Sequence, residues 1–223
     1  MKSYVRKSNR KSSKPKKSFT QRVKRVITGA AQSKFISGSI SLPAVISQTV
    51  YAQSPTQNIG NGTNIGGRIG DQVYLQSLQL NGYMFSSATA LTNAKYRVSV
   101  VYSSLQIPCA AVSASPSFLP NDLFLSNTYT VNTVVGVYDP KAVNVLADVT
   151  IDLNSLVSTS QDIRSFAMDI PLKDFKMAYI DTGSPFGKTK NLYVVVQAYT
   201  PTTAAISNLG SVLMSWNLKF KDI

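Results

Sequence analysis

The chain has 223 residues, and 23 Lys and Arg against 10 acidic residues give it a formal net charge of +13. It contains no His and no Glu, which excludes a Ser-His-Asp or Cys-His nucleophilic site. The single cysteine, Cys109, excludes an intramolecular disulfide framework and a cysteine-rich metal site.

The positive charge is concentrated at the N-terminus. Residues 1–34 contain twelve basic residues and no acid, whereas residues 35–223 contain eleven basic and ten acidic residues. Such a block repels itself, so we expect it to stay disordered until a polyanion neutralises it. We therefore predict a nucleic-acid-binding arm whose contacts are mostly with phosphates and blind to sequence. Its predicted binding residues are Lys2, Arg6, Lys7, Arg10, Lys11, Lys14, Lys16, Lys17, Arg22, Lys24, Arg25 and Lys34.

A solubilising or purely targeting tail is the alternative interpretation of this arm. The runs Lys14–Lys17 and Arg22–Arg25 also match nuclear import signals, so a host import receptor is a candidate partner. The arm holds only two aromatic residues, Tyr4 and Phe19, so we expect no base-stacking platform within it. No apolar run reaches the length of a signal peptide core or of a membrane helix, so we expect no membrane insertion.

Residues 35–70 are polar and rich in Gly, Ser, Thr and Asn, and we interpret them as a connector. Five glycines between Gly60 and Gly70 raise the question of a phosphate-binding loop. Such a loop follows a strand and opens a helix, and a P-loop also needs a Gly-Lys-Ser/Thr end. Here the glycine-rich segment precedes a predicted strand, and it contains no lysine. We predict a lead-in whose glycines permit close backbone packing or positive φ.

After Asp71 the sequence alternates between apolar and polar residues with period two, which is typical of strands with one side on a core. The clearest run places Val212, Met214, Trp216, Leu218 and Phe220 on one face. The first run changes phase, which indicates a β-bulge near Ser77. Pro171 should end its strand or place it on a sheet edge. The predicted strands are 71–81, 95–103, 129–138, 144–153, 163–170, 174–181, 191–199 and 211–221.

These strands, separated by turn signals such as Asn81-Gly82, predict an all-β fold. We expect a single eight-stranded antiparallel jelly roll of two packed sheets in residues 71–223, preceded by a disordered basic arm. Trp216, the only tryptophan, should lie in the core.

Few residues are candidates for chemistry. Asp148 and Asp152 share one strand face about 13 Å apart, too far for joint acid–base catalysis. We interpret them as a solvated outer face, with a calcium site at a subunit contact as the alternative. Cys109 has no evident base partner, so we interpret it as a packed or loop thiol. We predict no catalytic residue, no metal site and no cofactor.

Six segments resemble the capsid proteins of circular, Rep-encoding single-stranded DNA viruses. The segments are RIGDQVYLQSLQLNGYM, KYRVSVVYS, VVGVYDP, IPLKDFKMAYI, GKTKNLYVVVQAYTP and SWNLKFKDI, and they occur in order after Gly60. The matching positions are Arg68–Gly70, Arg97–Tyr102, Tyr138-Asp139, Lys173–Tyr179, Asn191–Val196 and Phe220–Asp222.

The resemblance implies a structural protein and not an enzyme. It implies that about 60 copies self-assemble into a small icosahedral virion shell around single-stranded DNA, with assembly in the host nucleus. A coat protein of a small positive-strand RNA virus is an alternative, since such coats share this design. A non-viral jelly-roll binding module with a basic tail is a further alternative. If the body instead of the arm contacts nucleic acid, Arg68, Lys95 and Arg97 are the residues to examine.

Overall fold

The computed structural model describes residues 33–46, 49–86, 93–106, 109, 113–114, 124–125, 136–154, 162–200 and 208–222. Gln32–Ile223 forms one compact unit, and Met1–Ala31 is assigned to a separate one. The predicted arm therefore lies outside the described residues except for its last two positions, and its disorder stays a prediction. In the described part of the chain, no helix has the length and apolar character needed to cross a membrane.

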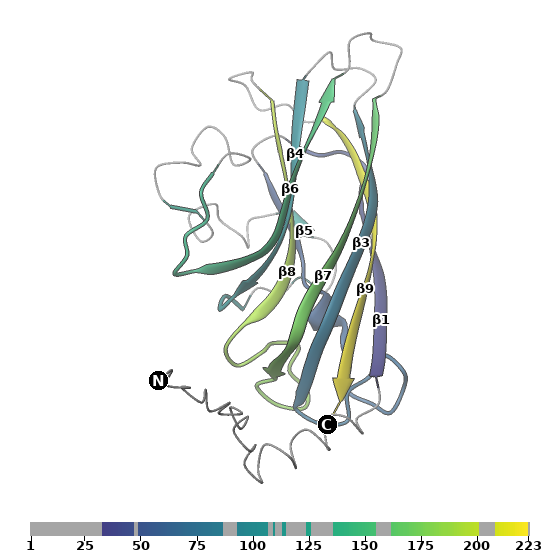
Figure 1. Cartoon of the computed structure of the whole chain (residues 1–223), viewed down its shortest axis with the longest axis vertical. Helices are drawn as coiled ribbons and strands as arrows, with labels where there is room; N and C mark the ends of the chain where they lie inside the picture. The colour runs from purple at the N-terminus through teal and green to yellow at the C-terminus, as the bar shows by residue number, and fades with distance from the viewer. Residues whose placement is uncertain are drawn as a thin grey trace, which may run out of the picture. The chain divides into compact units, whose positions relative to one another are not determined.

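The folded unit consists of two antiparallel sheets packed face to face (Figure 1). The four-stranded sheet has the order β1 (Ser33–Leu42), β9 (Gly210–Asp222), β3 (Gln72–Ser86), β7 (Ile163–Ala178). The five-stranded sheet has the order β5 (Ser113–Ala114), β2 (Val50–Gln53), β8 (Asn191–Tyr199), β4 (Asn93–Ser103), β6 (Val143–Asn154). A short 3-10 helix, η1 (Pro55–Asn58), follows β2.

The strands pair as one long nested hairpin. β1 pairs with β9, β2 with β8, β3 with β7 and β4 with β6. Successive pairs alternate between the two sheets, which is the winding of a jelly roll. The predicted all-β antiparallel jelly roll is confirmed, with the two-residue strand β5 as an extra strand at one edge.

Two strands lie in the segment that we interpreted as a connector. β1 and β2 both precede Asp71, so the prediction that all strands begin after this residue is wrong. Along β1, the inward positions Ile36, Gly38 and Ile40 alternate with outward serines. The glycine interrupts the apolar row, and glycine is depleted in strands, so the local pattern does not predict a strand here.

Gly38 makes room for the only tryptophan. Gly38 and Trp216 are register partners on β1 and β9, and a Cβ on Gly38 would lie 2.7 Å from Trp216 Cε2. The indole Nε1 donates a 2.8 Å hydrogen bond to Gln53 Oε1 on β2, in the opposite sheet. Trp216 is 2% exposed, so its predicted place in the core is confirmed. The residue therefore joins both sheets.

Two strand boundaries differ from the prediction. Asn81-Gly82 does not end a strand, because β3 continues to Ser86 with Gly82 packed between Met214 and Phe166. The predicted strands 163–170 and 174–181 are one strand, β7, with a bulge where Lys173 and Asp174 both have φ of 53°. The predicted strand 129–138 lies almost entirely outside the described residues.

Two other local predictions are confirmed. The register of β3 shifts between Leu75 and Ser77, which is the bulge inferred near Ser77. Pro171 lies in β7, which pairs with β3 alone and is therefore an edge strand. Edge strands tolerate proline, because one side of the strand has no neighbour that needs its N–H groups.

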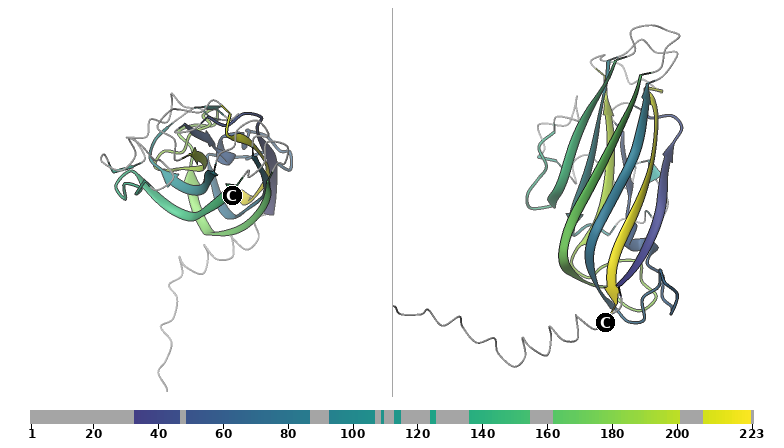
Figure 2. Two further views of the ribbon diagram at one scale, coloured as in Figure 1. Left: turned by 90° about the horizontal axis from the view of Figure 1, so that it is seen from above. Right: turned by 45° about the vertical axis from the view of Figure 1, so that its right-hand side comes forward.

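The two sheets differ in what covers their outer faces. β8 is buried on both sides: Leu192, Val194 and Val196 face the inner core, and Tyr193 and Val195 face a second apolar cluster. That second cluster includes Cys109, Phe124 and Tyr138, and it covers part of the outside of the five-stranded sheet. On the four-stranded sheet, exposed residues alternate along every strand, and no described segment crosses this face (Figure 2, right).

Replacing Trp216 tests the packing between the sheets. We expect Trp216→Ala to lower the free energy of unfolding by about 3–5 kcal/mol, because it leaves a cavity between the two layers. Urea denaturation of dissociated subunits measures the loss. Leu213→Ala on the opposite face of β9, where the side chain is 50% exposed, is the control and should change stability by less than about 0.5 kcal/mol. Equal stability of Trp216→Ala and wild type would contradict the packing described here.

Candidate functional site

A buried ion pair connects the first and last strands at one end of the sandwich. Lys34 Nζ on β1 lies 3.0 Å from Asp222 Oδ2 on β9, and the side chains are 7% and 5% exposed. Lys34 also donates to the carbonyl of Gly67 at 2.8 Å, and Asp222 Oδ2 accepts from the Ile69 N–H at 2.6 Å. These bonds attach the glycine-rich loop to both strands.

The position of Lys34 corrects one predicted site residue. Its ammonium group is buried and occupied by Asp222 and Gly67, so we remove it from the nucleic-acid-binding set. The other eleven basic residues of the predicted set lie outside the described residues, and their role stays a prediction.

The glycine-rich loop is closed by its own backbone. Gly62 N–H donates to the Arg68 carbonyl and Arg68 N–H donates to the Gly60 carbonyl, each at 2.9 Å. Gly62 has φ of +149°, and a Cβ on Gly67 would lie 2.6 Å from the Gly62 carbonyl oxygen. Positive φ and close approach are the two uses predicted for these glycines, so that interpretation is confirmed.

Arg68 holds this loop against the loop after β7. The guanidinium group donates to the carbonyls of Gly70, Thr182 and Ser184 at 2.8–3.0 Å. It also stacks 3.7 Å from the centre of the Tyr179 ring. Burial raises the pKa of Tyr179, whose hydroxyl remains protonated. Arg68 is 1% exposed, so it supports the fold and does not face a phosphate.

The two aspartates on β6 are each bonded to a cation of the neighbouring strand. Asp148 accepts from Arg97 Nε at 2.9 Å and from Ser99 Oγ at 2.9 Å, and Asp152 pairs with Lys95 at 2.9 Å. A calcium ion would have to displace these bonds. Within the described ranges, no group of three or more Asp or Cys side chains could hold a metal ion.

Arg97 is also part of the fold. It is 8% exposed, lies 4.5 Å from the Tyr138 ring centre and donates to the Gly136 carbonyl at 2.6 Å. Burial by itself lowers the pKa of Arg97, but the hydrogen bond to Asp148 and the electrostatic interactions with Tyr138 and Asp148 together outweigh burial, so the pKa is raised. Burial also raises the pKa of Tyr138 to about 12. Arg97 and Arg68 are thus buried in the subunit, whereas Lys95 is about half exposed and pairs with Asp152 at the surface.

Cys109 is buried against the outer side of the five-stranded sheet. Its N–H donates to Gln57 Oε1 at 2.8 Å, and Gln57 Nε2 lies 3.8 Å from the thiol. Burial raises the pKa of the Cys109 thiol to about 12, although the hydrogen bonds from Ser54 and Gln57 oppose this shift. A packed, neutral thiol agrees with the prediction from sequence.

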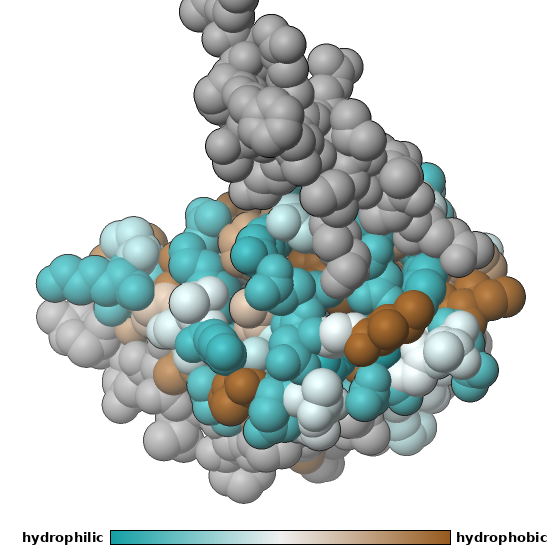
Figure 3. Space-filling model, turned by 90° about the horizontal axis from the view of Figure 1, so that it is seen from below, coloured by the Kyte–Doolittle hydropathy of each residue, from teal (hydrophilic) through white to brown (hydrophobic). Residues whose placement is uncertain are grey.

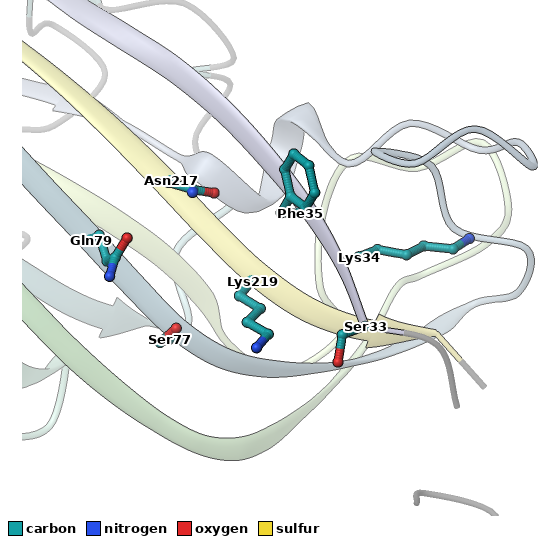
Figure 4. Close-up of a pocket in the computed structure, with 7 residues that line it drawn as sticks. All are labelled: Ser33, Lys34, Phe35, Ser77, Gln79, Asn217 and Lys219. Atoms are coloured by element: carbon teal, nitrogen blue, oxygen red, sulfur yellow. The ribbon is translucent and has the colours of Figure 1, made fainter. Parts of the chain in front are cut away.

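Several shallow hollows lie on the bare face of the four-stranded sheet. A hollow of about 440 Å³ lies near the start of β1, and three more follow the same face toward Tyr83. The first hollow is lined by Ser33, Lys34, Phe35, Ser77, Gln79, Asn217 and Lys219 (Figure 4). Phe35 is not among the residues predicted from the sequence, because the local pattern does not mark β1 as a strand.

Comparisons with known proteins add little beyond this geometry. The sequence matches no protein-family model and no curated protein. Similar solved structures include a chain of Desmodium yellow mottle tymovirus, with 8% identity, TM-score 0.36 and coverage of 100% of this chain and 92% of that chain. A chain of turnip yellow mosaic virus has 10% identity, TM-score 0.36 and coverage of 86% and 95%. Because both TM-scores are low, the fold assignment depends on the strand order and not on these likenesses.

Breaking the Lys34–Asp222 pair should destabilise the fold. We expect Lys34→Met to cost about 3–5 kcal/mol, because it leaves the Asp222 carboxylate buried without its cation. Lys34→Met/Asp222→Asn should recover much of this loss, since the amide oxygen still accepts from Ile69 N–H and no charge remains. Denaturant unfolding of both variants measures the difference. A single variant as stable as wild type would show that the pair is not closed in solution.

The raised pKa of Cys109 predicts a chemically silent thiol. At pH 8 only roughly one thiol in ten thousand should be ionised in the folded protein, against about a quarter for a cysteine with a pKa near 8.5. Iodoacetamide should therefore label Cys109 only after unfolding, and mass spectrometry can follow this. Rapid labelling of the native protein at pH 8 would contradict the buried position.

Proposed function

We propose that this chain is a viral coat protein that self-assembles into a small icosahedral shell of about 60 copies and packages single-stranded DNA. The observation that carries the proposal is the union of a jelly-roll body with an N-terminal segment that contains eleven Lys and Arg and no acid in residues 1–31. The body suits a wall element, and the basic segment suits a polyanion.

The division of charge supports this assignment. With eleven of 23 basic residues in residues 1–31, the body retains twelve basic and ten acidic residues, a net charge of +2. A nearly neutral body can pack against copies of itself with little long-range repulsion. About 60 arms would bring roughly 660 positive charges to the packaged genome.

The surface of the body offers contacts for a second copy. Ile65 and Ile69 are 66% and 67% exposed on the glycine-rich loop. The same loop is held rigidly by Arg68, Lys34 and Asp222. Exposed apolar side chains on a preorganised loop are suited to subunit contacts, because little conformational entropy is lost on binding. Seen from this end of the unit, apolar patches stand out on a mostly hydrophilic surface (Figure 3).

The proposal that the packaged genome is single-stranded DNA rests on the sequence resemblance to capsid proteins of circular, Rep-encoding DNA viruses. Under this proposal the protein acts in the virion and assembles in the host nucleus, which the basic runs of the arm would reach through an import receptor. A coat protein of a positive-strand RNA virus has the same physical design and is the alternative. We propose no enzymatic activity.

Deleting residues 1–31 tests the role of the arm. Ser33 and Lys34 must be kept, because β1 begins there and Lys34 pairs with Asp222. The full-length protein should bind single strands with a log–log salt slope of at most about −8 for eleven phosphate contacts at −0.7 each. The deletion should remove most of this slope and the packaged nucleic acid, while the melting temperature stays unchanged.

A full-length variant with the eleven basic residues replaced by Gln separates charge from length and should behave like the deletion. Negative-stain microscopy of the full-length protein tests the shell directly. Nucleic acid bound with the original slope after deletion would contradict the role of the arm. Absence of particles from the full-length protein under all assembly conditions would instead favour a non-viral binding module.

A further inference from the structure

The bare face of the four-stranded sheet is chemically graded along its strands. At the end where β1 begins, the exposed residues include lysines; the middle carries amides and hydroxyls such as Gln79, Asn217 and Ser37. The far end carries Tyr83, Leu213 and Ile163, each about half exposed. The end of the face that carries the lysines is also the end where β1 begins, at Ser33.

Four lysines belong to this end of the face. Lys219 and Lys221 lie on β9 about 7 Å apart along the strand, and Lys173 and Lys176 lie at the bulged end of β7. Register places Lys221 and Lys176 on either side of Tyr74. Two acids share this face: Asp174 accepts a hydrogen bond from Gln76, and Asp169 is the register partner of Gln79. The four lysines outnumber these two acids, so the local charge is positive, which favours an anionic ligand.

The hollow at this end combines three kinds of recognition group. Phe35 and Ser77 are the register partners of Lys219 on its two sides, so an aromatic ring, an ammonium group and a hydroxyl stand in one row. Phe35 occupies an outward position of β1, and its side chain is 55% exposed. Gln79 and Asn217 line the same hollow with amide groups (Figure 4). In Figure 4, Lys34 extends away from these amides, in keeping with its bond to Asp222.

We propose that this hollow is a nucleotide subsite for a single-stranded nucleic acid. An unpaired base stacks on Phe35, the amides of Gln79 and Asn217 bond to its edge, and Lys219 and Lys221 contact the phosphates on either side. A positively charged track with an aromatic platform is the usual means of binding single strands without sequence preference. The inference rests on the proposed packaging function and extends it from the arm to the body.

A single strand suits the hollow better than a duplex. Base stacking on Phe35 needs a base whose face is open, and bases in a duplex are already stacked on their neighbours. In the proposed shell, the four-stranded sheet would then face the genome. The five-stranded sheet, with its apolar cover, would lie on the other side of the wall.

The test uses the full-length protein and a short fluorescein-labelled oligothymidylate, with affinity measured across a salt series. Phe35→Leu should weaken binding about fivefold or more, the lower end of the range for one stacked base, with no change of salt slope. Phe35→Tyr should bind like wild type, because it keeps the ring. Lys219→Gln/Lys221→Gln should reduce the slope by about 1.4. Lys141→Gln, an exposed lysine outside the four-stranded sheet, is the matched control and should leave the slope unchanged.

Lysine acetylation followed by mass spectrometry gives a second measurement that does not depend on any variant. The oligonucleotide should protect Lys219 and Lys221 and leave Lys141 as reactive as before. No protection, together with wild-type affinity and slope in the Phe35 and Lys219 variants, would overturn the subsite.

The outcome separates this inference from the proposed function. If deletion of residues 1–31 abolishes binding while the Phe35 and Lys219 variants bind normally, the arm alone holds the genome and the subsite is wrong. If the Phe35 variants lose particles but not oligonucleotide binding, the hollow receives a second copy of the chain, which also overturns the subsite. If neither the deletion nor these variants affects binding, the packaging proposal itself fails.

Discussion

The pairing of β1 with β9 is the contact on which the rest of the structure depends. It joins the first and last strands of the jelly roll and is the outermost pair of the nested set. Trp216 covers Gly38 within this pair and bonds to Gln53 in the other sheet, and Lys34 and Asp222 bury a charge pair at one end. A contact between residues so distant in sequence is costly to form but limits every later pairing.

Charge in the body is used in two ways. Five basic side chains among the described residues form ion pairs: Lys34, Arg68 and Arg97 are buried, and Lys95 and Arg164 are about half exposed. Arg68 and Arg97, which lie in two of the segments that carry the resemblance, also donate hydrogen bonds to backbone carbonyls. A planar guanidinium group has several donors and suits this role. Lys173, Lys176 and Lys219 on the bare sheet face are exposed to solvent. The proposed genome contacts on the body are therefore lysines of this face.

The two faces of the sandwich have different physical roles under the proposed function. Apolar residues around Cys109, Phe124 and Tyr138 cover part of the outer side of the five-stranded sheet, and the exposed Lys95–Asp152 pair lies on the remainder. The outer side of the four-stranded sheet keeps its polar and basic side chains in contact with solvent. Under the proposed function, an anionic strand therefore contacts the second face.

The sequence by itself determined the all-β class, the inward rows of β3, β4, β8 and β9, the bulge near Ser77 and the burial of Trp216. These features follow from period-two alternation, which is a local property. Charge counting likewise located the basic arm. The sequence did not reveal β1, since Gly38 breaks its apolar row, or the continuity of β7 through Pro171.

Only the tertiary structure decided what the individual charges do. Lys34 reads as the last cation of the arm, and Arg68 and Arg97 read as candidate phosphate ligands, yet all three are buried against partners distant in sequence. Phe35, Ser77 and Lys219 come from three strands and meet only when β9 lies between β1 and β3. Such groupings depend on strand order and register, which long-range pairing sets and local pattern does not encode.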